Sequence, residues 1–201
     1  MTLSSSWRSA RLAHRLNAAG FTLIELLVTV VVLAILLGLA VPAFRSFMQN
    51  DQQWVQQNTL VLALNTARSE AIKQDVALGV SVCASQLDTV PPTCDGASWA
   101  QGWIVVLNGV AGAKPIQTVG ALPANTTLTE DNGNLSVTFM SNGTLNTGLL
   151  ANPTAKVGFK MCDARGGAFA RYSQVTLMGR VVSAPNVGWN LNTPSQPLAC
   201  P

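Results

Sequence analysis

Histidine is almost absent from this sequence of 201 residues, which contains His14 and no other. Without histidine after position 14, Ser-His-Asp and Cys-His nucleophiles are excluded there, and so is the commonest metal-binding side chain. Acidic residues are also few, nine in all, and no Gly-rich loop followed by Lys and Ser or Thr is present to bind phosphate. The sequence therefore predicts a protein that is not an enzyme and that holds no cofactor and no metal.

Charge is scarce as well. Charged residues make up 10% of the chain, with 12 Lys and Arg against nine Asp and Glu. Three arginines, at positions 8, 11 and 15, precede position 20 without any acidic residue, which leaves a neutral remainder of nine basic and nine acidic residues. Overall charge thus gives no argument for a nucleic-acid partner. The last 46 residues nevertheless hold five basic residues against the single Asp163, namely Lys156, Lys160, Arg165, Arg171 and Arg180.

A long apolar run extends from Phe21 to Phe44, and Glu25 is its only ionisable residue. As a helix rising about 1.5 Å per residue, the run is long enough to span a hydrocarbon core of about 30 Å. The arginines before it predict that residues 1–20 stay in the cytoplasm and that the chain after the run is exported. The expected parts are a cytoplasmic leader at 1–20, a transmembrane half-helix at 21–44 and a periplasmic domain at 45–201.

Two simpler interpretations explain less. An ordinary secretory signal peptide would be cut after Gly38-Leu39-Ala40, but such peptides have an apolar core of about 7 to 15 residues with no charge inside it. A plain membrane anchor accounts for the length of the run and leaves Glu25 unexplained. A carboxylate in lipid costs on the order of a few kcal/mol, so Glu25 needs a partner.

The junction Gly20-Phe21, followed by Thr22-Leu23-Ile24-Glu25, resembles the amino terminus of type IV prepilins. The resemblance implies that a prepilin peptidase cuts between Gly20 and Phe21, that the new amino terminus at Phe21 is methylated, and that Glu25 is retained. In lipid, the carboxylate can be neutralised by the amino terminus of a neighbouring subunit. Phe21 and Glu25 are therefore the expected assembly residues.

All four cysteines follow the apolar run, which fits an oxidising compartment. Of the three possible pairings, the spacing favours Cys83 with Cys94 and Cys162 with Cys200. A zinc site of four thiolates is the alternative, disfavoured because no Cys-x-x-Cys spacing occurs. The second disulfide would hold the irregular, Pro- and Asn-rich tail from Pro185 to Pro201.

The first helix is expected to pass Pro42, which can kink it, and to continue to about Lys73, because apolar residues recur downstream at helical spacing. These residues are Leu60, Leu64, Ala67 and Ala71. Trp54 is equally consistent with an anchor at the membrane interface and with packing on the domain.

Short β-branched or alternating segments predict strands at 77–83, 103–107, 135–140, 156–162 and 169–180. Asn132-Gly133 and Asn142-Gly143 are typical of hairpin turns, and residues 163–167 of a further connection. The neighbouring carboxylates Glu130-Asp131 are expected to be solvated in the first of these turns rather than to form a catalytic pair.

The part after the membrane run resembles the GspH/FimT family of minor pilins and pseudopilins. The matching pieces are Cys83-Ala84-Ser85, Cys94, Trp99, Gly102-Trp103-Ile104-Val105-Val106, Phe139, Gly143, Cys162-Asp163-Ala164-Arg165-Gly166, Ala170-Arg171, Gly179-Arg180 and Cys200. The resemblance implies an α+β, type IV pilin-like fold, with a long helix packed on antiparallel sheet. It also implies a subunit at or near the tip of a type IV pilus or type II secretion pseudopilus, anchored in the inner membrane. Its partners would be other pilins, the prepilin peptidase and the inner-membrane assembly platform.

One departure bears on a second function. FimT-branch members implicated in DNA uptake carry Gly-Arg-x-Arg near the carboxyl end, whereas this chain has Gly179-Arg180-Val181-Val182. Val182 removes the second positive charge. DNA binding for natural transformation, by the five basic residues of the last 46, is therefore the alternative and not the favoured function.

The Gly20-Phe21 junction generates the first prediction. Mass spectrometry of the mature protein from its native host is expected to find an amino terminus at Phe21 carrying a methyl group. A chain that begins after Ala40 would show that an ordinary signal peptidase processes it and would contradict the prepilin interpretation.

Overall fold

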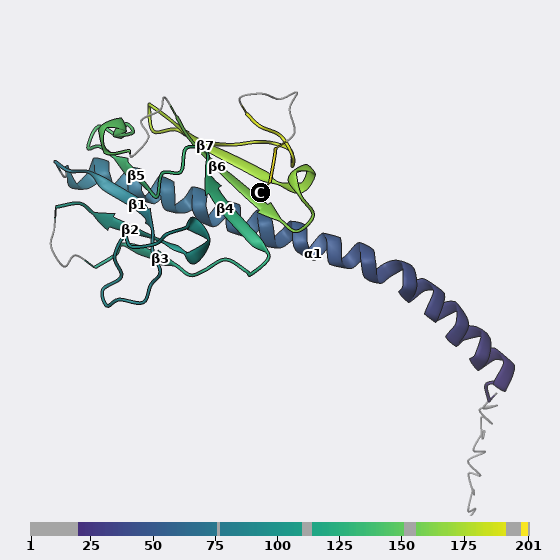
Figure 1. Ribbon diagram of the computed structural model, residues 1–201. Helices are drawn as coiled ribbons and strands as arrows, with labels where there is room; N and C mark the ends of the chain where they lie inside the picture. The colour runs from purple at the N-terminus through teal and green to yellow at the C-terminus, as the bar shows by residue number, and fades with distance from the viewer. Residues whose placement is uncertain (1–19, 76, 110–113, 151–155, 192–197, 201) are drawn as a thin grey trace, which may run out of the picture. The chain divides into compact units, whose positions relative to one another are not determined.

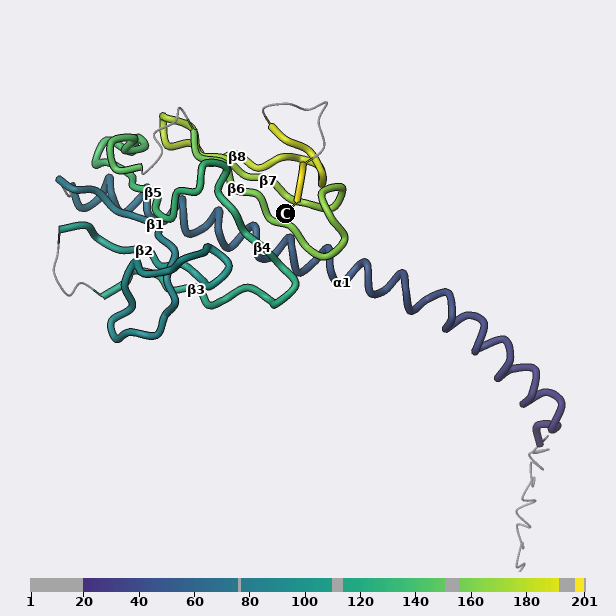
Figure 2. The backbone as a smooth tube through the Cα atoms, in the orientation of Figure 1, coloured from purple at the N-terminus to yellow at the C-terminus, as the bar shows by residue number. Residues whose placement is uncertain are grey.

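The computed structural model describes residues 20–75, 77–109, 114–150, 156–191 and 198–200. The leader arginines and His14 lie outside these residues. The chain divides into two compact units, Met1–Ser46 and Phe47–Pro201. One helix, α1 (Leu23–Gln74), contributes to both units, as the chain trace in Figure 2 shows.

Helix α1 begins at Leu23, with only Thr22 between it and the Gly20-Phe21 junction. The hydroxyl of Thr22 accepts a hydrogen bond from the Glu25 main-chain N–H at 3.3 Å, which satisfies one of the free donors at a helix start. Pro42 lies inside the helix and Lys73 in its last turn. The expected end near Lys73 is therefore confirmed.

The amino-terminal part of α1 has no apolar core of its own. All its side chains are exposed as far as Gln49. Among the described residues, α1 is the one helix long and apolar enough to cross a membrane. An exposed apolar surface of this extent needs lipid or other helices around it.

The later part of α1 buries one face. Leu60, Leu64, Ala67 and Ala71 are each at most 1% exposed, which confirms the predicted stripe. Ala63 joins the stripe, and these residues belong to one core cluster with residues of both sheets. Trp54 remains 49% exposed, but the Arg171 guanidinium lies 4.9 Å from its ring centroid, so the indole contacts the domain.

Two four-stranded antiparallel sheets cover this part of α1 (Figure 1). The first has the order β3-β2-β1-β5. Its strands are β1 (Val80–Ala84), β2 (Trp103–Leu107), β3 (Gln117–Val119) and β5 (Ser136–Phe139). The second has the order β4-β6-β7-β8. Its strands are β4 (Thr126–Glu130), β6 (Lys156–Asp163), β7 (Arg171–Thr176) and β8 (Val181–Ser183).

The chain changes sheets between β4 and β5, and this overturns one expected hairpin. Asn132-Gly133 joins strands of different sheets, so it is a crossover turn rather than a hairpin turn. The expected turn at Asn142-Gly143 is confirmed, because Phe139 and Leu145 form an antiparallel bridge around it. The connection at residues 163–167 is confirmed too, since it joins the paired strands β6 and β7.

The strand prediction was also wrong at other points. The single strand expected over 169–180 is shorter, because Gly167–Phe169 forms a 3₁₀ turn and the chain turns again after Thr176 to start β8. Strands β3, β4 and β8 were missed. They are three to five residues long and lie at sheet edges, so little burial marks them in the sequence.

One core joins the helix to both sheets. Trp99 and Phe159 meet edge to face at 4.9 Å between ring centroids, and the Trp99 indole N–H donates to the Asn134 carbonyl at 2.7 Å. The sheets also meet through a main-chain bond from Leu145 N–H to Leu177 carbonyl, at 2.9 Å. The core is therefore continuous across the sheet boundary.

The two disulfides follow the pairing that the spacing favours. Cys83 is bonded to Cys94 and Cys162 to Cys200, with Cα–Cα distances of 5.4 and 5.9 Å. The second bond joins β6 to the chain end, where Leu198 is buried beside Tyr172. On a chain-entropy model, closing these loops contributes about 3 and about 4 kcal/mol.

Leu64 and Leu62 offer a matched test of the core. Leu64 is fully buried against both sheets, whereas Leu62, two residues earlier on the same helix, is 58% exposed. We expect Leu64→Ala to lower the free energy of unfolding by about 2 to 5 kcal/mol, through lost burial and a cavity. Leu62→Ala should change it by no more than about 0.5 kcal/mol. Denaturant unfolding of both variants measures this, and equal effects would contradict the assigned helix face.

Candidate functional site

The residues expected to take part in processing and assembly lie at or just before the start of α1 and are accessible. Phe21 is 81% exposed, and Gly20 and Glu25 are exposed as well. Glu25 lies in the first helical turn, where the helix dipole favours a negative charge. Within the described part of the chain, no hydrogen-bond or ion-pair partner meets its carboxylate. The geometry leaves that carboxylate available to a group from another molecule.

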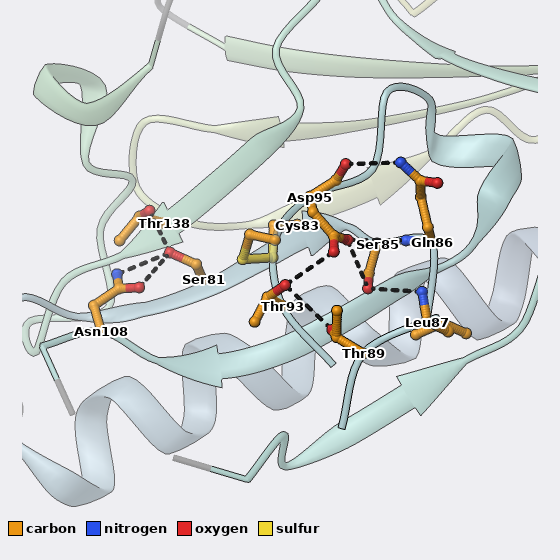
Figure 3. The surroundings of a disulfide bond; sticks show 11 residues. Ser81, Cys83, Ser85, Gln86, Leu87, Thr89, Thr93, Asp95, Asn108 and Thr138 are labelled. Atoms are coloured by element: carbon orange, nitrogen blue, oxygen red, sulfur yellow. Dashed lines mark hydrogen bonds between the residues drawn. A yellow bond between two sulfur atoms is a disulfide. The ribbon is translucent and has the colours of Figure 1, made fainter. Parts of the chain in front are cut away.

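The disulfide-closed loop after β1 is held by Asp95 (Figure 3). Its carboxylate accepts from the Gln86 N–H at 3.1 Å and from the Thr93 hydroxyl at 2.9 Å. These bonds, that of Gln86 first, hold the pKa of Asp95 below its usual value. Asp95, next to Cys94, thus ties both sides of this loop together.

A second polar cluster lies along the same sheet (Figure 3). Ser81 contacts the Thr138 hydroxyl at 2.7 Å, and the Asn108 amide donates to Ser81 at 2.8 Å and to the Leu78 carbonyl at 2.9 Å. These bonds tie β1 to β5 and to the end of β2. They contain no acid–base pair, and within the described residues no group of three or more His, Cys, Asp or Glu is placed to hold a metal ion.

The carboxylates Glu130 and Asp131 are not equivalent, which corrects the expected solvated turn. Glu130 is only 6% exposed and accepts from the N–H groups of Asn132 and Asn134 at 2.9 and 2.7 Å. Asp131 is exposed and accepts from the Tyr172 hydroxyl at 2.5 Å. Glu130 therefore shapes the crossover turn, which the sequence did not indicate.

The five basic residues do not share one surface. Directly opposed residues of an antiparallel pair face the same side of a sheet. Lys160 opposes Tyr172 and Lys156 opposes Thr176, away from the core residues of β6. Arg171 opposes the core residue Met161 and so faces the helix. Arg180 lies on the exposed turn before β8.

An acidic residue separates the two lysines. A Cβ at Gly158, midway between them on β6, would collide with the Asp131 carboxylate and the Tyr172 hydroxyl. Gly158 is therefore needed to leave room for the Asp131 carboxylate and the Tyr172 hydroxyl above β6. The result is a negative charge between Lys156 and Lys160, which weakens the attraction of that face for phosphate.

Arg165 and Arg171 are committed to the domain. Arg165 forms an ion pair with Asp163 at 2.6 Å, donates to the Asn50 amide oxygen at 2.8 Å and lies 4.5 Å from the Phe169 ring centroid. Partial burial lowers the pKa of Arg171, and the nearby positive charge of Arg165 lowers it further. These two arginines therefore connect the end of β6 and the start of β7 to α1.

Gly179 has a structural role of its own. Its φ is +71°, and a Cβ there would collide with the Gly143 carbonyl oxygen. Arg68 of α1 donates to that same carbonyl and to the Met178 carbonyl, each at 3.0 Å. Arg68 thus holds the turns of both sheets on the helix. Sequence reasoning missed it because no local pattern marks it.

Comparison with known protein families gives two matches to this chain. The family described as type II transport protein GspH matches residues 56–179, and the prokaryotic N-terminal methylation motif matches residues 15–41. The first match covers more than half of the chain. The chain belongs to the GspH family.

The solved structure of a type IV minor pilin supports the fold. A crystal structure of FimU from Pseudomonas aeruginosa covers 69% of this chain and 92% of its own, with 25% identity and a TM-score of 0.52. A second crystal form of FimU covers 64% of this chain and 89% of its own, with 26% identity and a TM-score of 0.48. No curated protein matches the chain. The expected α+β, type IV pilin-like fold is confirmed.

The GspH match has informative limits. It includes the buried face of α1 from Leu60, three of the four cysteines and the turn that ends at Gly179. Arg180, Val182 and Cys200 lie beyond it. Of the five basic residues considered for DNA binding, Lys156, Lys160, Arg165 and Arg171 therefore lie inside the match, and Arg180 lies outside it.

The separation of the basic residues generates a prediction about DNA. The domain of residues 47–201 is expected to bind double-stranded DNA weakly at low salt, and at physiological salt not measurably. Each neutralised phosphate gives a log–log salt slope of about 0.9, so one or two contacts are lost quickly as salt rises. Titration of labelled duplex at both salt concentrations measures this.

Two variants control the DNA experiment. Val182 lies on β8 opposite Gln174, which in turn opposes Gly158, so Val182→Arg adds a positive charge to the face that carries both lysines. It should strengthen binding at low salt, and Arg180→Ala should weaken it. Micromolar binding that persists at physiological salt and is abolished by Arg180→Ala would make DNA capture the primary function.

Proposed function

We propose that this protein is a minor pilin or pseudopilin that assembles at or near the tip of a type IV pilus or type II secretion pseudopilus. The observation that carries the proposal is the accessible Phe21–Glu25 segment, whose carboxylate meets no partner among the described residues, at the start of a helix whose later half builds a GspH-family domain. The apolar beginning of the helix is suited to association in lipid, and its later half is suited to folding with the sheets as a domain.

The other assignments rest on the same motif. A prepilin peptidase would cut at Gly20-Phe21 and methylate Phe21. The arginines of the leader favour an inner-membrane protein with a single span and a periplasmic carboxyl-terminal domain. Other pilins or pseudopilins and the inner-membrane assembly platform would be its partners. The protein acts by assembly and not as an enzyme, in keeping with a family of structural subunits.

Residue Glu25 provides the test in the native host. A deletion strain complemented with Glu25→Ala should contain the protein in its membrane at the wild-type level, because the substitution makes the helix more apolar. The variant should be at least about tenfold depleted from sheared fibres, because it lacks the carboxylate that pairs with a neighbouring amino terminus.

Thr29→Ala is the matched control, since Thr29 lies one turn further along the same helix face and its hydroxyl donates to the Leu26 carbonyl of its own helix. Piliation, protein secretion and DNA uptake are scored together in each strain. Loss of piliation assigns the protein to a pilus, and loss of secretion assigns it to a secretion pseudopilus. Normal incorporation of Glu25→Ala into fibres would contradict the proposal.

A further inference from the structure

Two glutamines one turn apart on α1 are equally buried but differ in their hydrogen bonds. Gln53 and Gln57 are 2% and 3% exposed, so both amides are removed from water. The Gln57 amide N–H donates to the Tyr172 carbonyl at 3.1 Å and to the Ser173 hydroxyl at 2.8 Å. Among the residues that the structure describes, the Gln53 amide nitrogen and oxygen meet no hydrogen-bond partner. A buried amide without partners is unfavourable, so Gln53 is costly to the isolated subunit.

Gln53 lines a pocket between α1, the start of β4 and the end of β6. The pocket has a volume of about 120 Å³, well above the roughly 10 to 15 Å³ that one water molecule needs. Its other polar residues are Gln49, Gln52, Asn125, Thr126 and Asp163. The space is sufficient for one small polar side chain.

The charge of the pocket restricts what can enter. Asp163 is the only ionisable residue among the described residues that line it, and both of its carboxylate oxygens accept hydrogen bonds from Arg165. The remaining polar groups are amides and one hydroxyl. A neutral group that both donates and accepts hydrogen bonds therefore fits better than a cation or an anion.

We propose that this pocket, defined by Gln49, Gln52, Gln53, Asn125 and Thr126, receives an amide or hydroxyl side chain from a neighbouring pilin subunit. The terminal torsion of glutamine is broad, so the Gln53 amide can turn toward the incoming group. Docking then supplies the partners that the amide lacks in the single subunit. This inference rests on the proposed function, because it requires assembly.

The position of the pocket in the chain supports a pilin as the occupant. Only four residues separate Phe44, the end of the apolar run, from Gln49. When the apolar segments of neighbouring subunits pack side by side, the helix residues that follow them are close to the next subunit. The pocket is therefore placed where a contact between subunits must occur.

Methionine substitutions separate this role from a structural one. Methionine is similar in size to glutamine, is a good helix former and has no amide. In the detergent-purified full chain, Gln57→Met should lower the melting temperature by at least about 2 °C, because it breaks two buried bonds. Gln53→Met should leave the melting temperature unchanged or raise it.

In the native host the order should reverse, so that Gln53→Met and not Gln57→Met loses incorporation into fibres. The ratio of fibre-incorporated to membrane-held protein should fall about tenfold for Gln53→Met, the size of effect expected from a lost hydrogen bond in a contact. A fall in melting temperature equal to that of Gln57→Met would show that water inside the subunit satisfies Gln53, and would overturn the inference. Unchanged incorporation would overturn it as well.

The wild-type chain distinguishes the two proposals. If it is absent from fibres, the proposed assembly function itself fails. If it is present and Gln53→Met is incorporated equally well, only the pocket inference fails.

Discussion

The buried face of α1 is the constraint on which the rest of this structure depends. Both sheets pack on that one stripe, and its alanines, Ala63, Ala67 and Ala71, are fully buried in the shared core. Arg68 leaves the same helix to hold the turns at Gly143 and Met178, where the two sheets meet. Without the helix, each sheet would present an apolar face with nothing to cover it, so helix and sheets must fold as one unit.

The same helix has two parts with different surroundings. Up to Gln49 its side chains are exposed, and from Gln53 onward one face is buried. A continuous helix therefore connects an apolar surface that needs partners to a domain closed by two disulfides. The carboxylates Glu130, Asp131 and Asp163 are each engaged in holding turns and strands together.

Whether a feature can be predicted from the sequence depends on how far apart in the chain its interacting residues lie. Local periodicity located the helix and its stripe, and cysteine spacing indicated the disulfide pairing. The crossover at Asn132-Gly133 could not be predicted, because a hairpin turn and a sheet-changing turn use the same residues. Nor could the difference between Gln53 and Gln57 be foreseen. It depends on Ser173 and Tyr172, more than 100 residues away in the sequence.

The central claim is that this protein is a minor subunit placed at or near the end of a fibre. Immunogold electron microscopy of native fibres, with an antibody against the exposed turn that contains Met178, tests it most directly. A deletion strain serves as the blank. The account predicts gold at one end of each labelled fibre and none along the shaft. Regular labelling along the shaft, or fibres of normal number that never carry the label, would contradict it.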